Sequence, residues 1–199
     1  MTFTLTRFQQ GQFLDASDPE TRGGVCVALC DLWLQSLFQA PGAAPRLRLQ
    51  ALAVDFSRAE AHQRRYGRLR NALGREDARR HMGARVGVDY EEQTFVDMKL
   101  HVGRQGMLRK VTDDLREPGA AATWSMRFSG GGGHAIAGIN RIEKRPYGLD
   151  CRIHIFDPNI GEYAGDYGSA GAIIQNLVRR IPLYATTAIF HRTAATGTR

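Results

Sequence analysis

The 199-residue chain lacks the features of a membrane protein or of a disulfide-stabilised secreted protein. No stretch approaches the roughly 18–20 uncharged apolar residues that a membrane-spanning helix needs. The N-terminal stretch MTFTLTRFQQGQF has no apolar core of signal-peptide length, so we do not expect Sec-type export. The three cysteines are an odd number, which argues against a disulfide framework and favours a reducing compartment.

Lysine is scarce, and arginine supplies most of the positive charge. The chain has 24 arginines and 3 lysines, with a formal net charge of +7. Residues 46–85 alone hold 11 arginines and 4 acidic residues. The difference equals the net charge of the whole chain. Such a segment suits nucleic acid, anionic lipid or an acidic partner, although a solvated helical face is the simpler interpretation. No RNP, zinc-finger or helix-turn-helix signature is present, so nucleic acid is not an expected partner.

The first half of the chain carries the spacing that is typical of helices. Apolar side chains recur every three or four residues from Val25 until Pro41 ends the run. The same spacing predicts helices over about 55–80 and 91–102. We therefore expect the segment 42–120 to be helical.

Beyond residue 118 the spacing becomes that of strands. The stretches TWSMRF, HAIAGINRI, CRIHIF and LYATTAIFHR show strand-like patterns, and one more helix is predicted over 169–181. Helices followed by strands predict an α+β fold in which N-terminal helices pack on a mostly antiparallel sheet. Because no repeat or linker is evident, we expect a single domain over 1–199 that includes an N-terminal arm over 1–22.

Three residues suited to nucleophilic catalysis stand at the ends of predicted elements. Cys26 opens the first helix, where free N–H groups and the helix dipole lower a thiol pKa. His134 begins a strand after four glycines, and an imidazole can accept a thiol proton and return it later. Asp157 closes the next strand, and a carboxylate on the second ring nitrogen orients the imidazole. The three residues predict a Cys–His–Asp triad.

Each of these residues also has a simpler structural interpretation. Cys26 shares a helical stripe with Trp33, as a core cysteine would. The GGGGH loop suits a phosphate only if a helix follows it, whereas a strand is predicted after His134. Asp157 opens an Asp-Pro-Asn turn. A zinc site on Cys26 and Cys30 lacks the usual paired spacing, so we expect no metal and no other cofactor.

The segments GGVCVALCDLWL, GGGGHAIAGI and IHIFDPNIGEY together resemble the YopT/AvrPphB family of bacterial effector cysteine proteases. That family has a papain-like fold and a Cys–His–Asp triad. The resemblance implies that Cys26 is the nucleophile, His134 the base and acid, and Asp157 the orienting carboxylate. The middle of the chain, about 42–120, has no counterpart, and we expect substrate selection to reside there.

The chain departs from the papain-like pattern at the oxyanion hole. Papain-like enzymes carry a Gln or Asn five or six residues before the cysteine, where this chain has Glu20 and Thr21. The candidates for the donor are the Thr21 hydroxyl and the side chains of Gln10 and Gln12, folded back toward the site. Loss of one such donor typically lowers the rate by about 10²–10³.

The resemblance implies a cysteine endopeptidase that cleaves a specific host or target-cell protein through a thioester intermediate. It implies delivery from the bacterial cytoplasm by a contact-dependent secretion system, without a Sec signal. We expect a protein substrate that is acidic or membrane-proximal; the oligomeric state is not predicted. One alternative keeps the triad and hydrolyses Gln or Asn side-chain amides or cell-wall peptides. Another is a non-catalytic binding module that uses the arginine-rich helices.

Overall fold

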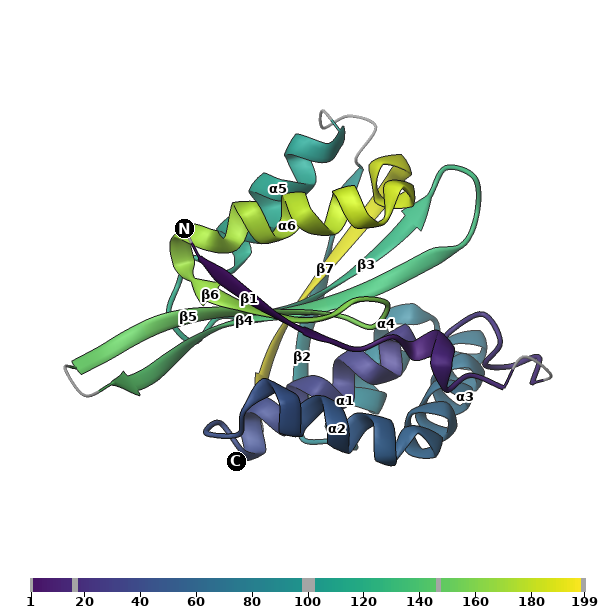
Figure 1. Cartoon of the computed structure of the whole chain (residues 1–199). Coiled ribbons are helices and arrows are strands. Elements are labelled where there is room, and N and C mark those ends of the chain that lie inside the picture. The colour runs from purple at the N-terminus through teal and green to yellow at the C-terminus, as the bar shows by residue number, and fades with distance from the viewer. Residues whose placement is uncertain (1, 16–17, 98–102, 146–147, 198–199) are drawn as a thin grey trace.

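Figure 1 shows the computed structural model of the chain, which describes residues 2–15, 18–97, 103–145 and 148–197. Its strands are β1 (Phe3–Arg7), β2 (Val88–Asp97), β3 (Ala121–Phe128), β4 (Gly133–Arg145), β5 (Gly148–Asp157), β6 (Gly161–Asp166) and β7 (Thr187–Gly197). Its α-helices are α1 (Cys26–Gln39), α2 (Pro45–Val54), α3 (Phe56–Leu73), α4 (Arg75–Ala84), α5 (Gly103–Asp114) and α6 (Ala170–Arg180). Short 3₁₀ helices cover Gln10–Gln12, Tyr167–Ser169 and Pro182–Thr186.

The strands of the described residues form a seven-stranded sheet in the order β1-β6-β5-β4-β3-β7-β2. All neighbouring strands run antiparallel. Helices α1–α4 cover one face of this sheet, and α5 and α6 cover the other (Figure 1). The predicted α+β class, with N-terminal helices packed on an antiparallel sheet, is therefore confirmed. None of the helices in the described ranges is long and apolar enough to cross a lipid bilayer.

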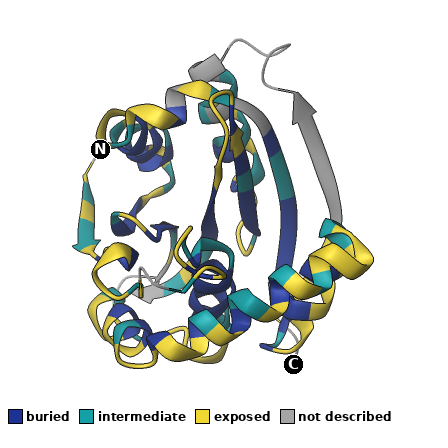
Figure 2. Cartoon of the chain, turned by 90° about the vertical axis from the view of Figure 1, so that its right-hand side faces the viewer, coloured by how far each residue is buried: buried dark blue, intermediate teal, exposed yellow. Residues whose placement is uncertain are grey.

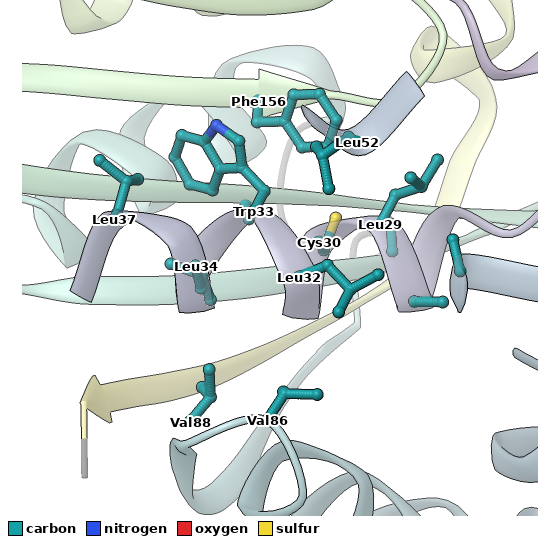
Figure 3. Packing of buried hydrophobic residues seen from close by; sticks show 14 of the residues in the cluster. Leu29, Cys30, Leu32, Trp33, Leu34, Leu37, Leu52, Val86, Val88 and Phe156 are labelled. Atoms are coloured by element: carbon teal, nitrogen blue, oxygen red, sulfur yellow. The ribbon is translucent and has the colours of Figure 1, made fainter. Parts of the chain in front are cut away.

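The two larger apolar cores of the described residues lie on opposite faces of the sheet, because alternate residues of a strand face opposite sides. Ala135 and Ala137 of β4 belong to the core beneath α1, whereas Ile136 between them belongs to the core beneath α6. Trp33 of α1 and Phe156 of β5 lie together in the first core, as Figure 3 shows, and their rings stack with centroids 5.5 Å apart. Buried residues accordingly concentrate on the strands and on the inner helix faces, while the outer faces are exposed (Figure 2).

Buried carboxylates add polar anchors to helix α1. Glu162 of β6 accepts the indole N–H of Trp33 at 2.8 Å and pairs with the Arg48 guanidinium of α2 at 2.7 Å. Asp31 of α1 pairs with the Arg79 guanidinium of α4 at 2.8 Å. Arg48 and Arg79 are both buried, so the interpretation of the basic segment as a solvated face is wrong for these two residues. These contacts join the middle of α1 to strand β6 through Glu162 and to helix α4 through Asp31.

The predicted helix over 91–102 is wrong where the structure describes that segment. Val88–Asp97 forms strand β2, which pairs with β7, and residues 98–102 lie outside the described ranges. Val88 and Tyr90 are buried while the residues that follow each of them are exposed, so the local period is two, as in a strand. The segment 42–120 is thus not helical throughout.

Two further boundaries differ from the sequence expectation. The helix expected over about 55–80 is divided into α3 and α4 at Gly74, whose φ of +87° is a conformation that favours glycine. The N-terminal arm, 1–22, contains strand β1, which pairs with β6 at one edge of the sheet. In β1 the apolar residues Phe3 and Leu5 alternate with Thr4 and Thr6, which is a strand pattern that the sequence analysis did not assign, whereas β6 (GEYAGD) shows no such alternation.

Candidate active site

Cys26 is the first residue of α1 and follows a glycine pair. Gly24 has a φ of +108°, and a Cβ added there would meet the side-chain amide of Gln10 at 3.4 Å. The thiol of Cys26 is half-buried, whereas Cys30, one turn further along the helix, is fully buried. The first turn of a helix has N–H groups without an intrahelical partner, which favour a negative charge. The local structure therefore leaves Cys26 accessible and Cys30 buried.

His134, the second residue of β4, lies close enough to the Cys26 thiol to change its pKa, and the two residues line the same hollows. Burial alone raises the pKa of the Cys26 thiol, but the hydrogen bond and charge of His134 outweigh it and lower that pKa. Burial lowers the pKa of His134, but Asp157 and then Cys26 raise it to about 10. Between these two pKa values both side chains are charged, so the arrangement favours a thiolate–imidazolium pair.

Asp157, the last residue of β5, is fully buried and lies on the far side of the imidazole. Its Oδ1 is 3.1 Å from Nε2 of His134, which leaves Nδ1 of that ring for the thiol. The same oxygen accepts the backbone N–H of Asn159 at 2.8 Å. Register explains the proximity, because β4 and β5 are neighbouring antiparallel strands, so the start of one lies beside the end of the other. The structure thus brings the three sequence-predicted residues together in the order Cys26–His134–Asp157.

Tyr184 joins this cluster, although nothing in the sequence spacing points to it. Its phenol O–H donates to Oδ2 of Asp157, and its ring stacks on that of His134 with centroids 5.5 Å apart. Burial and the charge of Asp157 raise the pKa of the Tyr184 phenol, which keeps it a donor. The stretch LYATTAIFHR was predicted as one strand, whereas Pro182–Thr186 forms a 3₁₀ helix before β7. That helix turns the tyrosine toward the carboxylate.

Gln10 is buried beside the residue that precedes Cys26. Its Oε1 accepts the backbone N–H of Val25 at 2.9 Å, and its Nε2 donates to Oδ1 of Asn159 at 2.7 Å. Because a backbone N–H can only donate, the contact with Val25 fixes which end of the amide carries the oxygen. The amide nitrogen therefore retains a second hydrogen, and Gln10 lines a pocket together with Cys26 and His134.

The other two oxyanion candidates lie differently. Thr21 is buried, and its hydroxyl donates to Oδ2 of Asp18 at 2.9 Å. Gln12 is exposed on the short helix after β1. Neither residue lines the pockets that contain Cys26. Of the three candidates, Gln10 is the one that the fold brings to the thiol.

Two hollows meet at Cys26 and His134. The larger is a cleft of about 850 Å³ between α3 and the β3–β4 hairpin, and the smaller is a pocket of about 240 Å³ beside Tyr184. The residues that line both hollows are Gly23, Gly24, Cys26, Phe128, Gly133 and His134. The thiol and the imidazole therefore stand where an extended chain can pass from one hollow to the other.

The glycine run before His134 is a hairpin turn between two strands. Gly131 and Gly132 have φ values of +91° and +78°, and Phe128 closes the turn by bonding to the carbonyl of Gly132 at 3.3 Å. No helix follows the run, so its backbone N–H groups do not form the helix-based cradle that binds phosphate. Among the residues described, no three His, Cys, Asp or Glu side chains are grouped as metal ligands would be.

The sequence matches no family model and no curated protein. Among solved structures, the chain is similar to the Pseudomonas avirulence protein AvrPphB, with a TM-score of 0.69 and 22% identity over 94% of this chain and 100% of that one. It is also similar to PatoxP, a cysteine protease-like domain of the Photorhabdus asymbiotica toxin PaTox, with a TM-score of 0.47, 9% identity and coverage of 96% and 53%. The likeness to AvrPphB confirms the predicted papain-like fold and the resemblance noted in the sequence motifs.

Proposed function

We propose that this protein is a cysteine protease with Cys26 as nucleophile, His134 as general base and acid, and Asp157 as the orienting carboxylate. The observation that carries the proposal is the unbroken series of contacts from the Cys26 thiol through His134 to a fully buried Asp157. These contacts lie at the junction of two hollows, so the thiol can be reached by a polypeptide. The likeness of the fold to AvrPphB supports the same conclusion.

The reaction follows from the protonation states of the pair. The Cys26 thiolate attacks the carbonyl carbon of a peptide bond, and the electron pair of the C=O bond moves to the oxygen. His134 then gives its proton to the nitrogen of the leaving amine, which leaves a thioester on Cys26 and neutral imidazole. Water attacks the thioester carbon and loses its proton to His134, and the thiolate departs from the new carboxylic acid.

The developing oxyanion needs donors that are already in position. The N–H groups at the start of α1 supply one side, as at any helix N-terminus. We assign the second donor to Nε2 of Gln10, because Gln10 lines a pocket together with Cys26, because one N–H of its amide is not used in the two contacts, and because those contacts hold the amide in place. This glutamine comes from the N-terminal arm rather than from the segment immediately before the cysteine.

The similar structure supports the proposed substrate class. The description of AvrPphB as an avirulence protein of Pseudomonas supports a protein of a host or target cell as substrate. Delivery from the bacterial cytoplasm by a contact-dependent secretion system agrees with that role. We retain both as part of the proposal.

The test compares lysate of target cells treated with the wild-type protein and with the Cys26→Ala variant, and reads new protein N-termini and deamidation in the same samples. New N-termini that depend on Cys26 are the expected result. Deamidation without new N-termini would replace the protease by an amidase that uses the same residues.

A thiol probe tests the catalytic pair without any substrate. We expect a neutral alkylating reagent to label Cys26 faster than Cys151, a half-buried free cysteine on β5 that serves as an internal reference. The His134→Ala variant should label more slowly at Cys26 and unchanged at Cys151. Equal labelling of the two cysteines in the wild type would instead favour the non-catalytic binding module.

A further inference from the structure

The larger of the two hollows beside Cys26 is strongly basic. Its arginines come from three elements, α3, α4 and β3, and are Arg64, Arg68, Arg70, Arg75 and Arg127. The lining includes one acidic residue, Glu20. A cleft lined by one sign of charge concentrates its field and raises the local concentration of the opposite charge.

Four of these five arginines have no carboxylate partner in the described part of the protein. Arg64 pairs with Asp18 at 2.9 Å and lies 3.8 Å from Glu60. The other four cleft arginines make no ion pair with a carboxylate of the described residues. By contrast, the buried guanidiniums of Arg48 and Arg79 both pair with carboxylates. Four guanidinium groups without a carboxylate partner among the described residues therefore line this one cleft.

Three of the four arginines lie close enough for the charges of two of them to lower the pKa of the third. Burial and the nearby charges of Arg127 and Arg70 lower the pKa of Arg75, against the opposing effect of Tyr66. His191, on β7 opposite β3, is also affected, because burial and then Arg75 and Arg127 lower its pKa to about 4. Like charges that approach one another without a partner repel, and a ligand that carries carboxylates would relieve this repulsion.

The smaller pocket on the other side of Cys26 has a different character. Its lining includes Leu14, Phe128, Ile181 and Leu183, with Arg22 as its one arginine. A polypeptide that crosses the thiol would therefore meet guanidinium groups on one side of the scissile bond and apolar side chains on the other.

We propose that the larger cleft binds an acidic segment of the substrate, with Asp or Glu side chains on one side of the scissile bond paired with Arg68, Arg70, Arg75 and Arg127. The inference rests on the proposed protease function and names the substrate class for it. Guanidinium groups suit this role because they bind carboxylates through two parallel hydrogen bonds.

The shape of the cleft favours a peptide over other polyanions. The arginines line a hollow that also contains Cys26, whereas a lipid surface would need an exposed, protruding patch. Binding of single-stranded nucleic acid usually relies on exposed aromatic rings for stacking. The aromatic residues of this cleft, Tyr66 and Phe128, are buried.

The first experiment digests a peptide library derived from a whole proteome with the wild-type protein and with Cys26→Ala, and aligns the cleaved sites. We expect Asp and Glu to be enriched on one side of the scissile bond only. Cleavage that depends on Cys26 but shows no acidic enrichment would overturn this inference and leave the proposed function standing. A wild-type protein that cleaves nothing would overturn the proposed function and this inference with it.

The second experiment compares two variants that lose the same charge. One replaces the four cleft arginines (R68Q/R70Q/R75Q/R127Q), and the matched control replaces four exposed arginines outside both hollows (R46Q/R85Q/R109Q/R179Q). On an acidic peptide from the library, we expect kcat/KM to fall about 10- to 100-fold in the cleft variant and to stay unchanged in the control. Equal loss in both variants, or no loss in either, would overturn the inference.

A charge exchange distinguishes a direct contact from a folding defect. The Arg127→Glu variant should cleave the acidic peptide poorly and a matched peptide with Lys in place of the acid better than the wild type does. Labelling of Cys26 by a neutral reagent should proceed in this variant, which would show an intact site. If the cleft variant instead loses binding to anionic vesicles or oligonucleotides while peptide cleavage is unaffected, the cleft serves a different polyanion and the inference fails.

Discussion

The phenol of Tyr184 and the carboxylate of Asp157 form a buried hydrogen bond behind the imidazole of His134. With the N–H of Asn159 on its other oxygen, the carboxylate has a donor on each side besides the histidine. The carboxylate of Asp157 is therefore held in one orientation. The ring of His134 contacts this carboxylate at its edge and the ring of Tyr184 on its face. Tyr184 touches no expected reacting atom, so we regard it as a positioning residue.

The Tyr184→Phe variant tests this role, because it keeps the ring and removes the O–H. We expect kcat to fall about tenfold with KM unchanged, since the histidine is less well aligned. Loss of a donor to a buried carboxylate should also lower the free energy of unfolding by about 1–3 kcal/mol. Steady-state kinetics and urea denaturation measure the two effects. Tyr167→Phe is a control far from the thiol, and a Tyr184→Phe variant with wild-type kcat would contradict the assignment.

The Gln10→Leu variant tests the proposed oxyanion donor. We expect kcat to fall by about 10²–10³, because one preorganised donor is lost from the transition state. Alkylation of Cys26 by iodoacetamide should be nearly unaffected, since that reaction forms no oxyanion. The matched control is Gln12→Leu, on the same short helix but exposed and outside both hollows. Equal rates of peptide cleavage for the two variants would exclude Gln10 as the donor.

The chemistry of the Cys26–His134 pair should depend on pH both at the acidic and at the basic end. Because His134 lowers the pKa of the Cys26 thiol, labelling of Cys26 should persist to lower pH than labelling of an ordinary cysteine thiol, which falls about tenfold per pH unit below the thiol pKa. The raised pKa of His134, about 10, means that general-acid catalysis is lost as the pH rises through that value. His134→Ala should shift the labelling profile of Cys26 to higher pH. Identical profiles in the wild type and this variant would contradict the ion pair.

Acid should destabilise the protein through Glu162. Burial opposes its charge, but the hydrogen bonds from His154 and Arg48 lower its pKa to about 2. An unfolded glutamate titrates near about 4.3, so this group stabilises the fold above that pH and loses the effect as the pH falls toward about 2. Urea denaturation at a series of pH values measures the decline.

The Glu162→Gln variant tests the same group by substitution. It leaves the Arg48 guanidinium buried without its carboxylate, and we expect a loss of about 3–5 kcal/mol in the free energy of unfolding near neutral pH. The decline of stability between pH values near 4 and 2 should be shallower than in the wild type. The control is Glu76→Gln, at a partly exposed position where little change is expected. Parallel pH profiles for Glu162→Gln and the wild type would contradict the assignment.

The candidate site was predictable from sequence where a residue type and the end of an element coincide. Cys26, His134 and Asp157 each begin or end a helix or strand whose periodicity is clear, and each lies in a recognisable motif. Tyr184 and Gln10 lie on short 3₁₀ helices that carry no periodic signal. Their proximity to the thiol arises from the tertiary fold, which local patterns do not encode.

The errors in the fold share a physical cause. The spacing that predicts a helix over 91–102 includes one residue of strand β2, Phe95, and the pairing of β2 with β7 decides in favour of the strand. Arg48 and Arg79 look like surface charges in a basic segment, but Glu162 and Asp31, which are distant in sequence, compensate their burial. In both cases the deciding partner lies far along the chain.

The Cys26 thiol can meet His134 only after the strands of the sheet have paired. Cys26 belongs to a helix near the start of the chain, whereas His134 and Asp157 occupy strands that pair only after residues far downstream have been made. In an unfolded chain the sulfur of Cys26 has neither its imidazole nor its helix terminus, and it is an ordinary thiol. The lowered pKa of the thiol is therefore acquired on folding, so under the proposed function a chain that crosses a barrier unfolded would lack its catalytic pair in transit and would regain it only where it refolds.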